Sequence, residues 1–427
     1  MTPIEHLKSL SLEISNPCNE RCVHCYRVCD STRQGFLTIE DVRLVFKQIE
    51  NIRSDKLQVT ITGGEALLNR NWKEILTFIQ NEGCSFSLFS NGTLLSDADA
   101  DFLASLVSKG LKEVQLSIYA LDPVIHDNVT NLKGSLKKTL QALQKLRMRN
   151  VPVFVSCPAM QVNKNNLANL MRWADKEKIP SCVDLFIFGV SDYSEKNLSQ
   201  RLNVDDLERF YEETMQNNGE LAYVWGYNRQ KTKPSECLFY GEAANGLCIS
   251  GDGSIYPMIG WYEKLGNIHQ DSVENVYTNH PILQQCRKIS VSDFCECIKC
   301  DAYGYCSLCP LPHLSANHGN LLNLDKSYCD YVHKVKELAQ RRDKVMEELA
   351  KNKKDVINSL SDNKRLKAHH DMLVKLFLRT NDEKLKKLLN DAIVFIADSG
   401  MINNPKKITL ALSTVPPYTD LINYCKE

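Results

Sequence analysis

Four cysteines lie close together near the start of the chain, in the stretch "PCNERCVHCYRVCD". Cys18, Cys22 and Cys25 have the spacing C-x3-C-x2-C, and Cys29 follows them. Clustered thiolates are typical ligands of zinc and of iron–sulfur clusters. Zinc would take all four thiols in a closed structural site, whereas a cluster held by three cysteines leaves one iron open. The spacing alone leaves both alternatives open.

A second group of cysteines lies between residues 237 and 329, in a segment rich in Gly and Tyr. Its central run, "CECIKCDAYGYCSLCP", has the spacing C-x2-C-x5-C-x2-C. Paired C-x2-C units are also typical of zinc knuckles, so a zinc ribbon is an alternative here. The candidate ligands of this group are Cys237, Cys248, Cys297, Cys300, Cys306, Cys309 and Cys329.

The overall composition limits the compartment and the partners. Lys+Arg and Asp+Glu balance at 52 each, which gives no global field for nucleic acid or an anionic membrane. The chain shows no signal-peptide pattern and no uncharged apolar run of membrane-spanning length. We therefore expect a cytoplasmic protein whose clustered thiols bind metal. Cys84, Cys157 and Cys182 stand apart and are predicted to be small buried hydrophobes.

Short β-rich runs alternate with helical segments over the first half of the chain. Thr38 with Asp41, and Ser96, predict helix starts, and Gly110 predicts a helix end. Near-continuous apolar strands joined by helices predict a parallel sheet buried on both sides. The fold class is therefore α/β, a partial (β/α)6 TIM-like barrel with ligands at the carboxyl ends of the strands. The predicted strands are 10–15, 57–62, 85–90, 114–119, 151–156 and 183–188.

Four segments are expected along the chain. Residues 1–215 form the barrel, 216–235 a connector, 236–330 a cysteine-rich domain and 331–427 a helical extension. Within the third segment, a hairpin is predicted to turn at Asp252-Gly253. Because this segment has few long apolar runs, bound metal would have to stabilise it.

These features together resemble the radical S-adenosylmethionine (SAM) superfamily. Its members carry C-x3-C-x-Φ-C after the first strand, where Φ is usually aromatic; here His24 has this place and Tyr26 follows. The resemblance implies a [4Fe–4S] cluster held by Cys18, Cys22 and Cys25, with SAM bound to the fourth iron. Cys29 would then be spare.

Three further motifs follow the next three predicted strands in the order that this superfamily has. "TITGGEALL" resembles the GGE motif that meets the amino group of SAM, with Gly63, Gly64 and Glu65. Glycines allow close approach of the backbone to a ligand, and a carboxylate can pair with an ammonium group. "FSNGTLL" and "VQLSIYALDPVIHDNVTNLKGS" resemble the ribose- and carboxylate-binding edges, with Ser90, Asn91 and Ser117 as the implied contacts.

The second cysteine group resembles the SPASM extension of radical SAM enzymes, which carries auxiliary [4Fe–4S] clusters. The resemblance implies one auxiliary cluster on Cys297, Cys300, Cys306 and Cys329, and a second one that involves Cys237, Cys248 and Cys309. Where the family has a further cysteine, this chain has Met258. Either the second cluster keeps an open iron that binds a substrate thiol, or Cys286 or Cys295 replaces the missing ligand.

The resemblance implies a peptide-modifying enzyme that generates a 5′-deoxyadenosyl radical. Its closest match in pattern is to maturases of ribosomally made precursor peptides, with oxidative thioether or carbon–carbon crosslinking as the expected outcome. The alternatives are peptide epimerisation, formylglycine formation in a sulfatase, dehydrogenation of a small molecule, or a non-enzymatic zinc-stabilised binding module. Expected partners are the precursor and an electron donor such as flavodoxin or ferredoxin. No leader-binding module is expected before the barrel, so the helical extension is a candidate for precursor recognition.

Overall fold

The computed structural model describes residues 6–226, 237–239, 242–306, 310–359 and 385–389. The chain divides into two compact units, Met1–Ala339 and Gln340–Glu427. The expected barrel and cysteine-rich segment both fall within the first unit, and most of the expected helical extension lies outside the described residues. The four segment boundaries stay predictions. In the described part of the chain, no helix combines the length and apolar character needed to cross a membrane.

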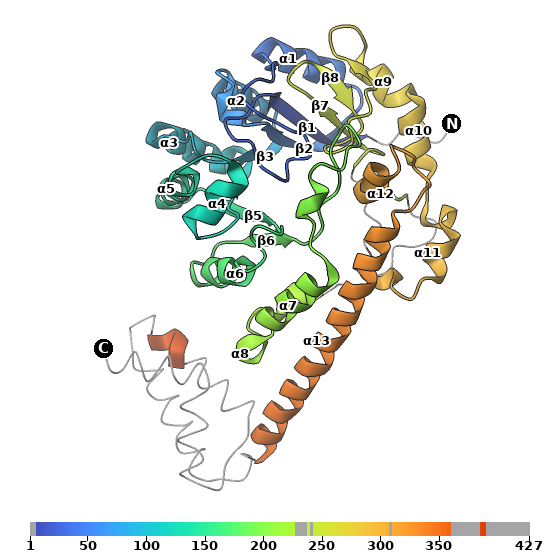
Figure 1. Cartoon of the computed structure of the whole chain (residues 1–427). Coiled ribbons are helices and arrows are strands. Elements are labelled where there is room, and N and C mark those ends of the chain that lie inside the picture. Colours follow the sequence, from blue (N-terminus) through green and yellow to red (C-terminus); the bar gives the residue numbers. More distant parts are fainter. Residues whose placement is uncertain (1–5, 227–236, 240–241, 307–309, 360–384, 390–427) are drawn as a thin grey trace. The chain divides into compact units, whose positions relative to one another are not determined.

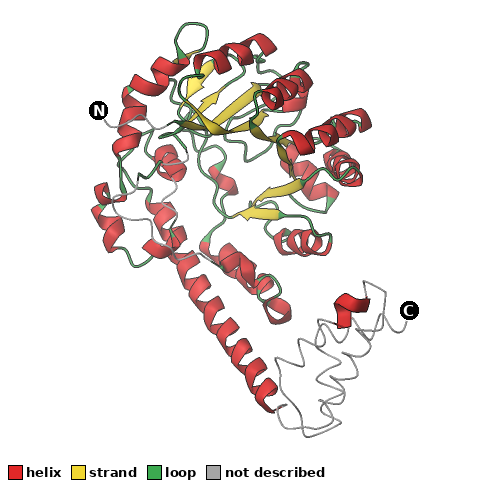
Figure 2. Ribbon diagram, turned by 180° about the vertical axis from the view of Figure 1, so that it is seen from behind, coloured by secondary structure: helices red, strands yellow, loops and turns green. Residues whose placement is uncertain are grey.

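Six parallel strands form the sheet that the sequence predicts, and each pairs with the next one along the chain (Figure 1). The α/β partial barrel is thereby confirmed, although β6 ends at Asp184 and not at residue 188. Figure 2 shows helices along the outer side of this sheet. The strands are β1 (Leu7–Ser15), β2 (Arg53–Gly63), β3 (Ser85–Ser90), β4 (Leu111–Ser117), β5 (Val153–Pro158) and β6 (Ser181–Asp184). The helices are α1 (Ile39–Gln48), α2 (Trp72–Asn81), α3 (Asp97–Leu106), α4 (Pro123–Thr130), α5 (Ser135–Met148), α6 (Leu167–Lys176), α7 (Val204–Thr214) and α8 (Gln216–Gly219).

The two faces of the sheet differ in burial. In β3, Phe86 and Leu88 are buried, whereas Ser85 and Ser87 between them remain partly accessible. Successive side chains of a strand point to opposite faces, so in β3 one face packs in the core and the other carries partly accessible serines. At the end of β1, by contrast, Leu12, Glu13, Ile14 and Ser15 are all buried. The predicted burial on both faces therefore holds for the end of β1 and not for β3.

Helix ends follow the predicted signals. Thr38 and Asp41 form a reciprocal capping box at the start of α1, and Ser96 and Asp99 form one at α3. Gly110, with φ of 112°, ends the 3-10 turn that follows α3. A left-handed backbone at this point favours glycine, because other residues would place a Cβ atom in a strained position.

The cysteine-rich segment contributes strands to the same sheet. The hairpin of β7 (Gly246–Ile249) and β8 (Ser254–Tyr256) turns at Asp252-Gly253 as predicted. β7 also pairs in parallel with β1, which the sequence did not predict, and β9 (Gly266–Asn267) pairs with β8. The remaining helices are α9 (Val273–Asn279), α10 (Pro281–Lys288), α11 (Cys295–Lys299), α12 (Pro310–Ala316) and α13 (Lys326–Ser359).

The three isolated cysteines do not all lie in the core. Cys84 and Cys157 are buried as predicted, at 6% and 1% exposure. The prediction for Cys182 is wrong, because its side chain is exposed. Cys182 lies on β6, the last strand at one edge of the sheet, and pairs with Ser156 of β5 on the face opposite the helices.

Candidate functional site

The loop between β1 and α1 carries the first cysteine group, and the backbone of α4 holds one side of it. The amides of Arg21 and Val23 donate to the carbonyls of Thr130 and Val129 at 2.9 and 3.0 Å. Thr130 is the last residue of α4. The loop is therefore fixed by strand-like hydrogen bonds to the end of a helix, independently of any bound group.

The two predicted glycines hold the other side of the loop. The amides of Gly64 and Glu65 donate to the carbonyls of Ser15 and Pro17 at 2.6 and 3.0 Å. A Cβ atom on Gly64 would lie 2.3 Å from the Pro17 oxygen, and one on Gly63 would lie 2.2 Å from the Ser15 oxygen. Both glycines thus lie in close contact with the backbone that leads into the cysteine loop, and their predicted approach to SAM stays a prediction.

Glu65 joins the ends of β2 and β3. Its Oε1 accepts hydrogen bonds from the Ser90 hydroxyl at 2.7 Å and the Leu67 amide at 3.0 Å, and its Oε2 accepts from the Asn91 amide at 2.8 Å. Burial raises the pKa of Glu65 in spite of these bonds. The side chain of Asn91 continues the network by donating to Asn19 of the cysteine loop at 2.9 Å. The predicted contacts Glu65, Ser90 and Asn91 are thus brought together at the first cysteine group.

Backbone amides point at two of the three predicted ligand sulfurs. The amide of Glu20 donates to Cys18 Sγ at 3.4 Å, and the amide of Cys29 donates to Cys25 Sγ at 3.5 Å. The Cys29 thiol also donates to Cys25, and these bonds lower the pKa of Cys25 to about 6 although burial opposes them. Burial raises the pKa of Cys18 to about 12. Such amide donors stabilise a thiolate, which is the form that binds metal.

A zinc site built from all four thiols would need Cys29 as its fourth ligand. Tetrahedral zinc, with Zn–S bonds of about 2.3 Å, needs sulfurs about 3.8 Å apart. Among the described residues, the group whose ligand atoms all lie within 4.8 Å of one another is Cys300, Asp301 and His333, and it includes none of the first four cysteines. Cys29 acts as a neutral thiol donor to Cys25, and its own pKa is raised.

The remaining predicted contacts surround the same loop. The ring of His24 lies 5.1 Å from that of Tyr119, and burial lowers the pKa of His24 to about 4. Tyr26 packs on Phe188 at 5.3 Å between ring centroids, and Ser117 is half-buried at the end of β4. Sequence reasoning missed Tyr119, whose hydroxyl lies 3.8 Å from Cys22 Sγ, because nothing in its local sequence distinguishes it from a core tyrosine.

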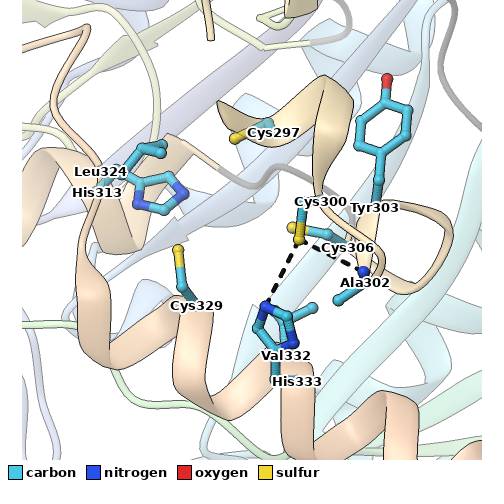
Figure 3. Close-up of a pocket in the computed structure, with 10 residues that line it drawn as sticks. All are labelled: Cys297, Cys300, Ala302, Tyr303, Cys306, His313, Leu324, Cys329, Val332 and His333. Carbon is cyan, nitrogen blue, oxygen red and sulfur yellow. Dashed lines mark hydrogen bonds between the residues drawn. The ribbon is translucent and has the colours of Figure 1, made fainter. Parts of the chain in front are cut away.

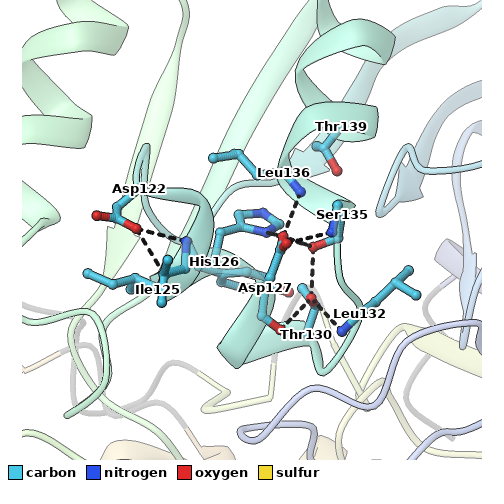
Figure 4. Close-up of polar contacts among 12 residues, drawn as sticks. Asp122, Ile125, His126, Asp127, Thr130, Leu132, Ser135, Leu136 and Thr139 are labelled. Carbon is cyan, nitrogen blue, oxygen red and sulfur yellow. Dashed lines mark hydrogen bonds and ion pairs between the residues drawn. The ribbon is translucent and has the colours of Figure 1, made fainter.

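A polar network fixes the end of α4 that supports the loop (Figure 4). Asp127 accepts hydrogen bonds from the Ser135 hydroxyl at 2.8 Å and the Leu136 amide at 3.1 Å, at the start of α5. The Ser135 hydroxyl also meets Thr130 Oγ1 at 2.8 Å and His126 Nδ1 at 3.0 Å. Burial lowers the pKa of His126 to about 4. This network is structural support for the cysteine loop, and it was not predicted from the sequence.

The second cysteine group frames a pocket (Figure 3). Cys297 lies in α11, Cys300 and Cys306 follow that helix, and Cys329 lies in the first turn of α13. The amide of Ala302 donates to Cys300 Sγ at 3.4 Å, in the same way as the amides of the first group. All four cysteines that the family pattern assigns to one auxiliary cluster therefore line one space. Two histidines that the sequence reasoning missed, His313 and His333, line it with them.

The remaining candidate ligands are distributed differently. Cys309 lies outside the described residues. Cys237 donates to the Cys286 carbonyl at 3.2 Å, and the neighbouring Cys237 contributes to the raised pKa of Cys286. Cys248 is fully buried on β7 beside Glu13 of β1. Of the two predicted replacements for the missing ligand, Cys286 is thus buried beside a predicted ligand, whereas the exposed thiol of Cys295 donates to the Ser292 carbonyl.

Comparison with known proteins identifies the kind of domain that carries the first cysteine group. Residues 12–174, which include its four cysteines and strands β2 to β5, match the family model described as the Radical SAM superfamily. Residues 12–174 of the chain therefore carry a radical SAM domain. This superfamily binds a [4Fe–4S] cluster and SAM, and SPASM relatives carry auxiliary clusters in addition.

The chain also resembles two curated relatives and one solved structure. It is 25% identical over 329 residues to the antilisterial bacteriocin subtilosin biosynthesis protein AlbA of Bacillus subtilis strain 168, covering 74% of this chain and 69% of AlbA. It is 31% identical over 158 residues to the sporulation killing factor maturation protein SkfB of the same strain, covering 37% of this chain and 36% of SkfB. The fold resembles that of Streptococcus suis SuiB bound to S-adenosylmethionine, with a TM-score of 0.56, 16% identity and coverage of 71% and 72% of the two chains.

The residues of the first site fit the cofactors of this enzyme class. Glu20 and Glu65 are both buried next to the cysteine sulfurs, and burial together with the neighbouring Glu65 raises the pKa of Glu20 to about 8. Glu20 Oε1 has no hydrogen-bond partner within the described part of the chain. A buried site with two carboxylates favours a cationic ligand, and SAM is a sulfonium with an ammonium group.

Proposed function

We propose that this radical SAM enzyme introduces an oxidative thioether or carbon–carbon crosslink into a ribosomally made precursor peptide. The observation that carries the proposal is the relation to AlbA, a bacteriocin biosynthesis protein. That alignment covers 74% of the chain. An alignment of this length includes part of the second cysteine group, whatever its starting residue. The relation to SkfB, a maturation protein, supports the same substrate class.

The chain's own residues have distinct tasks in this proposal. Cys18, Cys22 and Cys25 would hold the first cluster, and the amides that donate to Cys18 and Cys25 stabilise their thiolates. When bound, the cluster and SAM supply hydrogen abstraction from an unactivated carbon of the peptide. Glu20 and Glu65 supply buried carboxyl groups whose pKa is raised, and a bound cation would favour their ionised form, which would select the cationic cofactor over neutral analogues.

The face of the sheet opposite the helices is the proposed seat of the peptide. Hydroxyl side chains such as Ser87 of β3 and Ser117 at the end of β4 remain partly accessible there. Ligands of parallel α/β barrels bind at the carboxyl ends of the strands, where the cysteine loop also lies. We place this reaction in the cytoplasm, with a flavodoxin or ferredoxin as electron donor.

The test first searches the genes next to this one for a short precursor peptide. The reconstituted enzyme is then incubated anaerobically with that peptide, SAM and a reductant, followed by mass spectrometry. A crosslink removes two hydrogen atoms from the peptide. An unchanged mass with an inverted residue would indicate epimerisation instead, and an unchanged peptide with a modified sulfatase or small molecule would contradict the peptide proposal. A Cys22→Ala variant serves as the control without the first cluster.

A further inference from the structure

His313 of α12 is a buried histidine at the edge of the second cysteine pocket. Its side chain is 6% exposed, and Figure 3 shows its ring beside Cys297 and Cys329. The backbone amide of Asp325 donates to Nδ1 of His313 at 2.8 Å. Because Nδ1 is an acceptor, the proton of the neutral ring is on Nε2. His313 therefore presents an N–H donor at its Nε2 position.

This donor has no partner of its own. Nε2 of His313 is buried and makes no hydrogen bond within the described part of the chain. Apart from the cysteines, the pocket is lined mainly by apolar and aromatic side chains such as Leu324 and Val332. A buried donor without an acceptor is costly, so its persistence points to an acceptor that occupies the pocket. Sulfur is the acceptor that this pocket offers.

The ring is held firmly in this orientation. It packs edge-on against Tyr328, with 5.2 Å between ring centroids and an interplanar angle of 84°. The carboxylate of Asp325 accepts from the amide of Ser327 at 2.9 Å, which fixes the turn that carries the donating amide. Rotating the ring by half a turn would break the bond from the Asp325 amide. The orientation of Nε2 toward the pocket is thus set by the backbone.

We propose that His313 donates its Nε2–H to a sulfur of the auxiliary iron–sulfur cluster held by Cys297, Cys300, Cys306 and Cys329, and so sets the reduction potential of that cluster. The proposal rests on the auxiliary cluster of the proposed function. Hydrogen bonds to the sulfurs are among the features that tune cluster potentials. A donor favours the more negative reduced state, so His313 makes the cluster easier to reduce.

The second histidine of the pocket provides the matched control. His333 Nε2 lies 3.6 Å from Cys300 Sγ, but its side chain is 49% exposed and its Nδ1 lies 3.5 Å from Asp301. Water can replace an exposed donor, whereas it cannot enter the buried position of His313 as readily. We therefore expect a smaller change in potential when His333 is replaced than when His313 is replaced.

The experiment is an EPR-monitored redox titration of the full-length, anaerobically reconstituted chain, in a background where Cys18, Cys22 and Cys25 are alanine and the first cluster is absent. His313→Leu should retain its iron and shift the midpoint potential to more negative values, His313→Gln should shift it less, and His333→Gln should leave it nearly unchanged. A retained cluster with an unchanged potential in His313→Leu would overturn the proposal.

A second measurement does not depend on how His313→Leu folds. Pulsed EPR of the His333→Gln protein labelled with 15N-histidine should show nitrogen coupling to the auxiliary cluster, and the absence of coupling would overturn the proposal. Iron counting on a variant with all four pocket cysteines replaced by alanine separates the two levels of inference; these are Cys297, Cys300, Cys306 and Cys329. If the iron content of this variant equals that of the parent chain, the pocket holds no cluster. In that case the premise of an auxiliary cluster has failed, and not merely the role of His313.

Discussion

Arg27 and Glu13 form a buried ion pair directly behind the cysteine loop, and removing either charge tests how that loop is held. Arg27 Nη1 lies 3.1 Å from Glu13 Oε2, and the side chains are 6% and 1% exposed. The Tyr262 hydroxyl donates to Glu13 Oε1 at 2.6 Å, and Arg27 donates to Asn16 Oδ1 at 3.1 Å. Because Arg27 follows Cys25 by two residues, the pair anchors the loop to β1 and to the segment after β8.

The size of the effect follows from the burial and the separation. At 3.1 Å, an effective dielectric constant of about 20 gives an attraction of about 5 kcal/mol. Removing one member of a buried pair costs about 3–5 kcal/mol, because the other charge stays buried without a partner. We expect Arg27→Met and Glu13→Gln each to lower the free energy of unfolding by about this amount. The double variant should lose clearly less than the sum of the two.

The two variants should differ in their response to pH. Burial raises the pKa of Glu13 even beside Arg27, so loss of Arg27 raises it further. The folded Arg27→Met protein then retains a proton that the unfolded chain has released. Its stability therefore falls as pH rises above about 4.3, the ordinary pKa of a glutamate. Glu13→Gln removes this titration, so the deficit of Arg27→Met relative to Glu13→Gln should grow with pH.

The assay is urea unfolding of the metal-free chain, followed by circular dichroism at pH 6 and pH 8, with iron content measured after reconstitution. Arg149→Met is the control, since Arg149 pairs with largely exposed carboxylates at the surface, where such pairs contribute about 0–1 kcal/mol. The reasoning is refuted if Arg27→Met and Glu13→Gln behave like this control, or if their effects simply add.

Three other changes test the site from different sides. Gly64→Ala should reduce cluster incorporation strongly because its Cβ would meet the Pro17 carbonyl, whereas Gly83→Asn, where a Cβ meets nothing within 4 Å, should not; iron analysis distinguishes them. Cys29→Ala should retain the EPR signal of the first cluster, and loss of that signal would mean that four thiols hold the metal. Asp127→Asn should cost about 1–2 kcal/mol near pH 7. Because hydrogen bonds outweigh burial and lower the pKa of Asp127, this cost should begin to shrink in urea titrations below its ordinary pKa of about 3.9 and should vanish only below the lowered pKa of the folded state.

The features that the sequence predicted correctly are local ones. The strand runs, the capping boxes at Thr38 and Ser96, the glycine stop and the hairpin turn each depend on residues a few positions apart. The close spacing of Cys18, Cys22 and Cys25 likewise indicates a single loop whose cysteines could bind one common ligand. Such signals survive in a single sequence because the interacting groups are neighbours along the chain.

The features that were missed depend on partners far apart in the sequence. The parallel pairing of β7 with β1 places Cys248 opposite Ser11, although most of the barrel's sequence lies between these two residues. The tautomer of His313 is set by the amide of Asp325, the residue that precedes α13. Cys182 was expected to be buried because its neighbours are apolar, but its position on an edge strand exposes it. The strand pairing, the tautomer and the exposure of Cys182 depend on how the chain is arranged in space, which the local composition of the sequence does not indicate.

The anchoring of the first cysteine loop explains how a metal-binding segment stays ordered at a barrel mouth. Backbone bonds join it to the end of α4, the glycines of β2 press on its entry, and the Gly251 amide of the hairpin turn donates to Asn16 at 3.1 Å. These contacts come from three separate elements of the first unit, so none of them alone sets the positions of the sulfurs. The entropic cost of ordering the loop is therefore offset largely by contacts that form when the chain folds, and not by cofactor binding. A loop prepared in this way binds its cluster with little rearrangement, which is why a substitution behind it, at Glu13 or Arg27, should affect both stability and iron content.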